Sequence, residues 1–285
     1  MKLIIVSGLS GSGKSVALNT LEDLGYYCVD NLPAGLLEPF VDQFLSRPDT
    51  SGVKTAIGID ARNFSTDLGH FQQILERCKQ RGIGVDILFL QADNEILLKR
   101  FSETRRKHPL TNDGRSLAEA IQQERDILEP ISACAQLHVN TSSTNIHQLR
   151  DLIKERVAQT QDGHLSILLK SFGFKHGAPQ DADFIFDIRC LPNPHWENEL
   201  RPLTGRDPAV EQFLTGDEGV ETMYRHLLDF FLVWIPQFER ENRRYLTIAL
   251  GCTGGQHRSV YMAERLGKAL QERYPSVLIK HRELT

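Results

Sequence analysis

Residues Gly8 to Ser15, with the letters GLSGSGKS, have the types and spacing of a phosphate-binding loop. They fit the pattern of a glycine, four variable residues, then glycine, lysine and serine. The glycines let the backbone turn with its N–H groups facing inward, and the helix that follows adds its positive end. The predicted phosphate site consists of Gly8, Leu9, Ser10, Gly11, Ser12, Gly13, Lys14 and Ser15.

Two side chains of this loop could act directly on a bound nucleotide. Lys14 can bridge the outer phosphates, and the Ser15 hydroxyl can ligate Mg²⁺. A carboxylate that supports the metal is expected at the end of a neighbouring strand. Asp60, after the apolar run Ala56–Ile59, is the first candidate, and Asp30 is its rival. Either acid could instead only cap the end of its strand.

These residues define the candidate catalytic chemistry of the first half. Lys14 and Asp60 are the predicted catalytic residues, and Ser15 and Asp60 are the predicted metal ligands for Mg²⁺ bound with the nucleotide. Asp60 also begins a polar cluster at the carboxyl end of a strand, where α/β sheets bind ligands. The cluster consists of Asp60, Ala61, Arg62 and Asn63.

The segment from Lys99 to Lys107 is strongly basic, with Glu103 as its one acid. In phosphoryl-transfer proteins, mobile arginines close over the phosphates and neutralise the charge of the transition state. A run of charges at a helix end is also commonly a solvated surface. Both interpretations stay open for this segment.

A second strand–loop–helix pattern lies near the C-terminus, in YLTIALGCTGGQHRSVYMAERLGKAL. Glycines and a helix N-terminus again offer N–H donors, and Arg258 and His257 add side-chain donors. Cys252 and Arg258 stand in the C-x5-R spacing of cysteine-dependent phosphatases. The alternatives are a thiol phosphatase, a phosphate-sensing pocket without chemistry, and a glycine turn with a buried cysteine. The sensing pocket is favoured, because no acid in this half is clearly placed to protonate a leaving group.

The elements that position these loops follow from apolar runs and turn residues. Strands are predicted at residues 3–6, 26–29, 53–59, 85–90 and 136–139, with helices between them, which favours a mainly parallel sheet with helices on both faces. Ser116 and Glu119 predict a capping box, and Pro130 is expected to kink or end that helix. The second half has predicted strands at residues 165–169, 184–188, 246–250 and 277–279.

The chain is predicted to contain two α/β domains. A polar segment at residues 159–163 separates residues 1–160, the nucleotide-binding domain, from residues 161–285, a C-terminal domain with the second phosphate-binding loop. The 285 residues carry a net charge of −4, so any nucleic-acid binding must come from a local patch. No apolar run approaches a membrane span, and the five scattered cysteines favour a reduced, cytoplasmic location.

Both loops together make the sequence recognisable. The segments are VSGLSGSGKSVALNTLEDLGYYCVDNLP, IDARN, ETRRKHPL, SFGFKHGAPQDADFIFDIRCLPNPHW, RPLTG and YLTIALGCTGGQHRSVY. Over essentially the whole chain they resemble the RapZ/YvcJ family of bacterial P-loop nucleotide-binding proteins. The resemblance implies a domain similar to P-loop kinases, followed by a distinct C-terminal α/β domain.

The resemblance also implies ligands and partners. It implies ATP at Gly8–Ser15, GTP at Asp60–Asn63 and weak ATPase and GTPase activity. In enterobacterial relatives the family acts as an RNA-binding adapter for ribonuclease E, and its C-terminal domain senses a phosphorylated amino sugar, glucosamine-6-phosphate. The matching sugar-phosphate pocket here would consist of His195, Cys252, Thr253, Gly254, Gly255, His257 and Arg258.

The C-terminal tail departs from that pattern. The RNA-binding relatives end in a strongly basic tail, whereas this chain has six Lys and Arg against three Glu from Arg258 onward. The favoured function is therefore a metabolite-responsive regulator that binds ATP and GTP and hydrolyses them slowly. An RNA-binding adapter that directs a small RNA to a ribonuclease and a small-molecule kinase are the alternatives. The sequence leaves open whether the chain forms a homo-oligomer.

Overall fold

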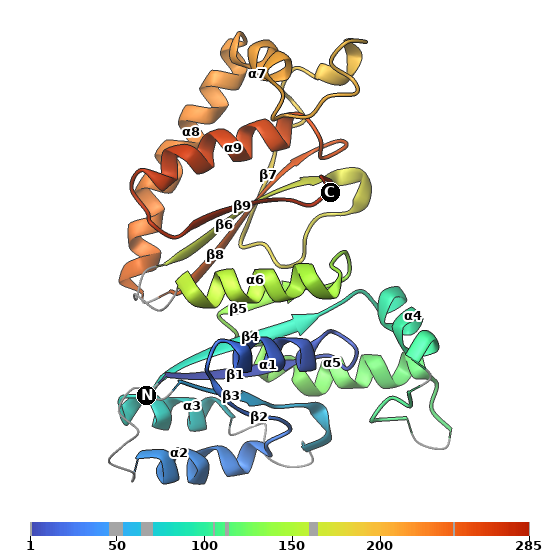
Figure 1. The fold of residues 1–285 in the computed structure, drawn as a ribbon, viewed down its shortest axis with the longest axis vertical. Helices are drawn as coiled ribbons and strands as arrows, with labels where there is room; N and C mark the ends of the chain where they lie inside the picture. The colour runs from blue at the N-terminus through green and yellow to red at the C-terminus, as the bar shows by residue number, and fades with distance from the viewer. Residues whose placement is uncertain are drawn as a thin grey trace. The chain divides into compact units, whose positions relative to one another are not determined.

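The computed structural model describes residues 2–45, 54–63, 71–104, 106–111, 114–159, 165–241 and 243–284. The chain forms two compact units, Met1–Glu155 and Arg156–Thr285, and the division falls inside helix α6 (Ile146–Gln159). Both units are built from a parallel sheet and helices (Figure 1), which confirms the predicted α/β fold class. Residues 160–163 of the predicted boundary segment lie outside the described residues.

The first unit contains five parallel strands in the order β2-β3-β1-β4-β5. Strand β1 lies between β3 and β4, so the loop that follows it leaves from the middle of the sheet. Leu3 to Val6 are all at most 2% exposed, as expected for a strand buried on both faces. The strand bounds are β1 (Lys2–Gly8), β2 (Tyr27–Val29), β3 (Lys54–Gly58), β4 (Gly84–Gln91) and β5 (Leu137–Asn140).

Helices cover both faces of this sheet (Figure 1). Leu3 and Ile5 of β1 belong to the core that α2, α3 and α5 close, whereas α1 packs on β1, β2 and β3 from the other face. The helices are α1 (Lys14–Asp23), α2 (Leu37–Leu45), α3 (Phe71–Gln80), α4 (Asn94–Thr104) and α5 (Leu117–Ala133).

Helix α5 begins as the sequence predicts. The Ser116 hydroxyl accepts from the Glu119 N–H, and the Glu119 carboxylate accepts from the Ser116 N–H, which confirms the capping box. The helix runs to Ala133, past Pro130, so the proline does not end it. The buried residues of the helix include four apolar side chains along one face, which hold it against the core on either side of the proline.

The second unit contains four parallel strands in the order β7-β8-β6-β9. All eight residues of β8 are buried, and β8 leads into the second glycine loop from inside the sheet. The strands are β6 (Ser166–Gly173), β7 (Phe184–Asp187), β8 (Tyr245–Cys252) and β9 (Val277–His281). The helices are α7 (Pro208–Thr215), α8 (Glu218–Arg240) and α9 (Arg258–Gln271).

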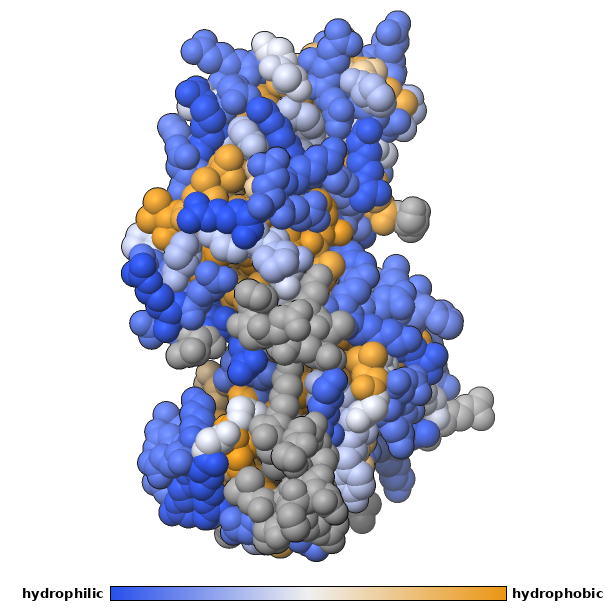
Figure 2. All heavy atoms as spheres, turned by 60° about the vertical axis from the view of Figure 1, so that its left-hand side comes forward, coloured by the Kyte–Doolittle hydropathy of each residue, from blue (hydrophilic) through white to orange (hydrophobic). Residues whose placement is uncertain are grey.

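Some large apolar side chains of this unit face solvent. Val233 and Trp234 of α8 are 59% and 48% exposed, and Trp196 is 75% exposed. Figure 2 shows apolar side chains on the side of the molecule where α8 lies in Figure 1. No helix in the described ranges combines the length and the apolar character needed to cross a membrane.

Candidate functional site

The first loop leaves β1 at a position that only glycine can occupy. Gly8 has φ +142°, and a Cβ there would lie 2.0 Å from the Leu90 carbonyl oxygen of β4. The Leu9 N–H donates to the same oxygen at 3.0 Å. Gly13, with φ +106°, closes the turn directly before α1 begins at Lys14. The glycine spacing therefore fixes how the loop passes between the sheet and the helix.

Lys14 folds back over the loop that precedes it. Its ammonium donates to the Gly8 carbonyl at 2.6 Å. Burial lowers the pKa of Lys14, whereas the charges of Glu124, Asp60 and Asp30 act to raise it. The loop therefore surrounds a cation that three carboxylates also approach.

Glu124 of α5 contacts the loop through Ser10 and is not among the predicted site residues. Its carboxylate accepts from the Ser10 N–H at 2.8 Å, from the Ser10 hydroxyl at 2.7 Å and from His108 Nε2 at 3.0 Å. Glu124 and His108 are 1% and 2% exposed. Burial acts to raise the pKa of Glu124, but these bonds and the charge of Lys14 hold that pKa below its ordinary value.

Arg100 braces the loop from another direction. Its guanidinium donates to the Gly11 carbonyl at 3.0 Å and to the Thr141 hydroxyl and carbonyl at 3.0 and 2.6 Å. The Thr141 hydroxyl also contacts the Ser12 carbonyl at 3.0 Å. In the basic segment of the sequence, Arg106 is exposed, and Arg105 lies outside the described residues. Arg100 therefore contacts the loop backbone, whereas Arg106 faces solvent.

The cluster that begins at Asp60 lies beside the same loop. Asp60 is 7% exposed and accepts from the Arg62 N–H at 3.0 Å and from its guanidinium at 2.9 and 2.6 Å. Ala61–Asn63 form a short 3-10 turn, and the side chain of Asn63 lies outside the described part of the chain. The charges of both Asp60 and Arg62 act on Lys14, so the predicted ATP and GTP segments adjoin one another.

The donors around Lys14 have the chemistry that Mg²⁺ requires. Ser15 is exposed on the first turn of α1, and Asp60 and Asp30 supply carboxylates at the ends of β3 and β2. A Cβ on Gly58 would lie 2.5 Å from an Asp30 carboxylate oxygen, so the glycine two residues before Asp60 makes room for the second acid. Mg²⁺ prefers hydroxyl, carboxylate, phosphate and water oxygens, so these residues fit the metal.

The second loop, in the C-terminal unit, encloses a buried thiol. Cys252 is 3% exposed, and its sulfur accepts from the Gly255 N–H at 3.2 Å and lies 3.2 Å from the Ser259 hydroxyl. Gly255 has φ +76°, and a Cβ on Gly173 would lie 2.6 Å from the Gly254 carbonyl carbon. The end of β6 therefore packs directly on the glycine backbone of this loop.

Arg258 opens α9 with a buried guanidinium that neutral groups hold. It is 4% exposed and donates to the carbonyls of Arg189 and Leu191 at 2.8 and 3.0 Å and to the Thr253 hydroxyl at 3.2 Å. Its Nε has no hydrogen-bond partner in the described chain. Asp187 is close enough for Arg258 to act on it, although Arg189 is the main cause of its lowered pKa. Neutral oxygens hold the guanidinium without cancelling its positive charge, which favours an anion at the start of α9.

The two predicted histidines of the pocket lie together. The rings of His195 and His257 are 6.3 Å apart. His257 donates from Nε2 to the Leu200 carbonyl at 3.1 Å, and burial lowers its pKa. A Cβ on Gly205 would lie 2.2 Å from the His257 carbonyl oxygen, so the RPLTG segment packs closely on the loop. The structure thus brings His195 next to the loop of Cys252 to Arg258.

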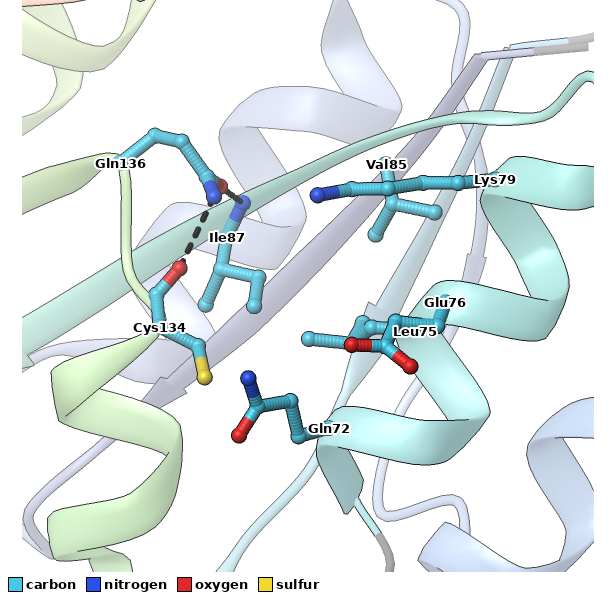
Figure 3. A pocket seen from close by; sticks show the side chains of 8 residues that line it. All are labelled: Gln72, Leu75, Glu76, Lys79, Val85, Ile87, Cys134 and Gln136. Atoms are coloured by element: carbon cyan, nitrogen blue, oxygen red, sulfur yellow. Dashed lines mark hydrogen bonds between the residues drawn. The ribbon is translucent and has the colours of Figure 1, made fainter.

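A separate pocket of about 170 Å³ lies between α3, α5 and the start of β4 (Figure 3). Gln72, Glu76 and Lys79 project from α3 toward it, and Cys134 faces them (Figure 3). Gln136 is held by the Ile87 N–H at 2.6 Å and the Cys134 carbonyl at 2.8 Å. The pocket adjoins the first half of β4, whereas the phosphate loop adjoins Leu90 at the other end of that strand.

Comparisons with known proteins place the chain in a family. The family model described as the RapZ-like N-terminal domain matches residues 1–161, and the RapZ C-terminal domain matches residues 165–285. The chain therefore belongs to the RapZ family, which confirms the resemblance that the sequence motifs indicate.

Full-length relatives support this assignment. A nucleotide-binding protein of Methylococcus capsulatus is 57% identical over 285 residues, which cover 100% of this chain and 96% of the relative. Nucleotide-binding proteins of Thioalkalivibrio sulfidiphilus and Pseudomonas putida are 55% and 52% identical, with 100% of each chain covered.

Solved structures overlap this chain less closely. A shikimate kinase from Bacteroides thetaiotaomicron is 17% identical and covers 55% of this chain and 98% of its own, with a TM-score of 0.36. The fold class rests on the two parallel sheets themselves.

Proposed function

We propose that the N-terminal unit binds ATP or GTP with Mg²⁺ and hydrolyses the nucleotide slowly, as part of a metabolite-responsive regulator. Gly8–Ser15 hold the phosphates, and Asp60–Asn63 line the same site. The observation that carries this proposal is the position of Lys14, whose ammonium lies 2.6 Å from the Gly8 carbonyl inside the turn. The names of the relatives, which are nucleotide-binding proteins, support it.

Each residue has a defined part in this proposal. The loop N–H groups and Lys14 stabilise the negative charge that develops on the outer phosphate. Ser15 and Asp60 would hold Mg²⁺, which supplies further neutralisation of that charge. The charges of Asp60 and Arg62 both act on Lys14, so the segment Asp60–Asn63 adjoins the phosphate loop. We therefore expect ATP and GTP to compete for one site.

A calorimetric titration of ATP and GTP into the wild type and Lys14→Ala tests the proposal. We expect Lys14→Ala to abolish binding of both nucleotides, because it removes the cation inside the loop. Lys79→Ala, at an exposed lysine of α3 in the same unit, is the matched control and should bind as the wild type does. Unchanged affinity in Lys14→Ala would refute the site. A metabolite that accelerates ATP turnover and is itself phosphorylated would favour the small-molecule kinase.

We further propose that the C-terminal unit binds a phosphorylated amino sugar as its regulatory ligand. The observation that favours this is the guanidinium of Arg258 at the start of α9, which neutral oxygens hold in place. Arg258 and the N–H groups at the start of α9 take the phosphate, and His195 lies beside the loop for the sugar. Because the thiol of Cys252 is held by Gly255 and Ser259, it has a structural part in this proposal.

Glucosamine-6-phosphate titrated into Arg258→Ala tests this second site. We expect affinity to fall by about 1.5–3 kcal/mol, the value of a hydrogen bond to a charged group. ATP affinity should be unchanged, and Arg240→Ala, at an exposed residue of α8, is the control. Equal loss of both ligands in Arg258→Ala would contradict two separate sites.

RNA-adapter activity is not part of this proposal. The tail residue Arg282 donates to the Gly173 carbonyl at 3.0 Å, pairs with Glu283 at 2.7 Å and lies over the ring of Phe172. A cation held within the fold contributes less to the neutralisation of RNA phosphates, which supplies most of such binding.

A further inference from the structure

Glu124 carries a buried negative charge, and its hydrogen bonds come from neutral groups. Two of these bonds come from Ser10 and one from His108. The Leu110 N–H donates to His108 Nδ1 at 3.1 Å, so Nδ1 is an acceptor and the ring proton lies on Nε2. His108 is therefore neutral in this arrangement. Neutral donors reduce the cost of burying a carboxylate, but they do not balance its charge.

The balancing charge belongs to the phosphate loop. Glu124 accepts from Ser10 of the loop, and the ammonium of Lys14 donates to the Gly8 carbonyl of the same loop at 2.6 Å, so the two opposite charges contact loop residues two positions apart. The charge of each also acts on the pKa of the other. Asp60 differs from Glu124, because the guanidinium of Arg62 lies against it. A nucleotide phosphate that pairs with Lys14 would place a second negative charge near the buried carboxylate of Glu124, which is unfavourable.

We propose that Glu124 is the internal counter-charge of Lys14 and that it lowers the affinity of the loop for the outermost phosphate of a nucleoside triphosphate. Through Ser10 it also fixes the shape of the loop, so it is a positioning residue. The part that concerns phosphate affinity rests on the proposed nucleotide function, whereas the pairing of Glu124 with Lys14 does not. In this arrangement the ligand-free loop already has a buried negative charge near Lys14, and the triphosphate is bound less tightly than the loop and Lys14 alone would bind it.

Glu124→Gln separates charge from shape. A glutamine oxygen in the place of Oε2 still accepts from the Ser10 N–H and His108, and its amide in the place of Oε1 can donate to the Ser10 hydroxyl. The substitution therefore keeps three hydrogen bonds and removes only the charge. Glu129→Gln, at an exposed residue of the same helix, is the matched control.

The first experiment measures stability without any nucleotide. Chemical unfolding of the full chain is compared for the wild type, Lys14→Met, Glu124→Gln and the double variant. Each single change removes one of two opposite buried charges at the same loop, and the double change removes both. We therefore expect the stability loss of the double variant to be smaller than the sum of the two single losses, by about tenfold in the unfolding equilibrium. If Glu124→Gln does not fold, the double variant should still fold. Additive losses, or a double variant that fails to fold, would overturn the pairing.

The second experiment titrates ATP and ADP into the same variants. We expect Glu124→Gln to bind ATP about tenfold more tightly than the wild type and ADP by no more than about threefold, because only ATP carries the outer phosphate. Glu129→Gln should match the wild type. Equal or weaker ATP binding in a folded Glu124→Gln would overturn the proposal. If the wild type binds neither nucleotide but the two charges remain coupled, the proposed function fails and the pairing stands.

Discussion

Replacement of Arg100 by alanine tests whether the basic segment braces the loop or covers the phosphates. The guanidinium makes three hydrogen bonds, to the Gly11 carbonyl and to two oxygens of Thr141. They share one charged group, so their loss is not a sum of three. We expect the unfolding free energy to fall by about 1.5–3 kcal/mol, the range for hydrogen bonds from charged groups. For a protein of this size that is a drop of roughly 3–12 °C in the melting temperature.

The ligand assay completes the test. Because Arg100 holds Gly11 within the phosphate loop, we expect ATP affinity in Arg100→Ala to fall about tenfold, equivalent to about 1.4 kcal/mol. Arg106→Ala, from the exposed part of the same segment, should change stability by no more than about 0.5 kcal/mol and leave ATP affinity unchanged. Thermal unfolding and calorimetry of both variants give these values. Equal behaviour of the two variants would refute the brace, and lost ATP affinity in Arg106→Ala alone would favour an arginine that closes over the phosphates.

Two further predictions concern the glycine turn and the second pocket. Gly8→Ala should lower the free energy of unfolding by about 3–5 kcal/mol in a urea titration, because its Cβ would overlap the Leu90 backbone. Gly25→Ala, also at positive φ but in open space, should lower the free energy of unfolding by about 1 kcal/mol. Equal losses in the two variants would contradict this. Burial lowers the pKa of His257 in the folded protein below its ordinary value of 6.5. The neutral ring therefore makes its full contribution to stability above pH 6.5, and this contribution is lost as the pH falls through the lower pKa of the folded protein. His257→Gln should show a flatter decline in stability over that range, and an unchanged slope would exclude His257 as the cause.

The backbone of both units could be predicted because parallel strands leave a plain pattern. Strands buried on both faces appear as largely apolar runs, and β1 and β8 each lead into a glycine loop. The two glycine loops could be predicted for a similar reason, because glycine is required where the backbone passes close to another strand. Gly8 beside Leu90 is one such place.

The side chains that support the first loop could not be predicted, because their partners are far apart in the sequence. Ser10 and Glu124 are 114 residues apart, and Arg100 lies 89 residues from Gly11. One signal was present: Glu124 falls among the buried apolar positions of α5, and a carboxylate on such a face requires a buried partner. The continuation of α5 past Pro130 also depends on tertiary packing, which outweighs local propensity.

The chain's two tryptophans, Trp196 and Trp234, both belong to the second unit. They are 75% and 48% exposed, so solvent and ligands can reach their rings. Tryptophan emission is therefore an intrinsic optical label for that unit, whereas circular dichroism reports on both. Unfolding curves from the two signals would coincide if the two units unfold together and would separate if each unit unfolds independently. The protein thus allows the cooperativity between its units to be measured without any added dye.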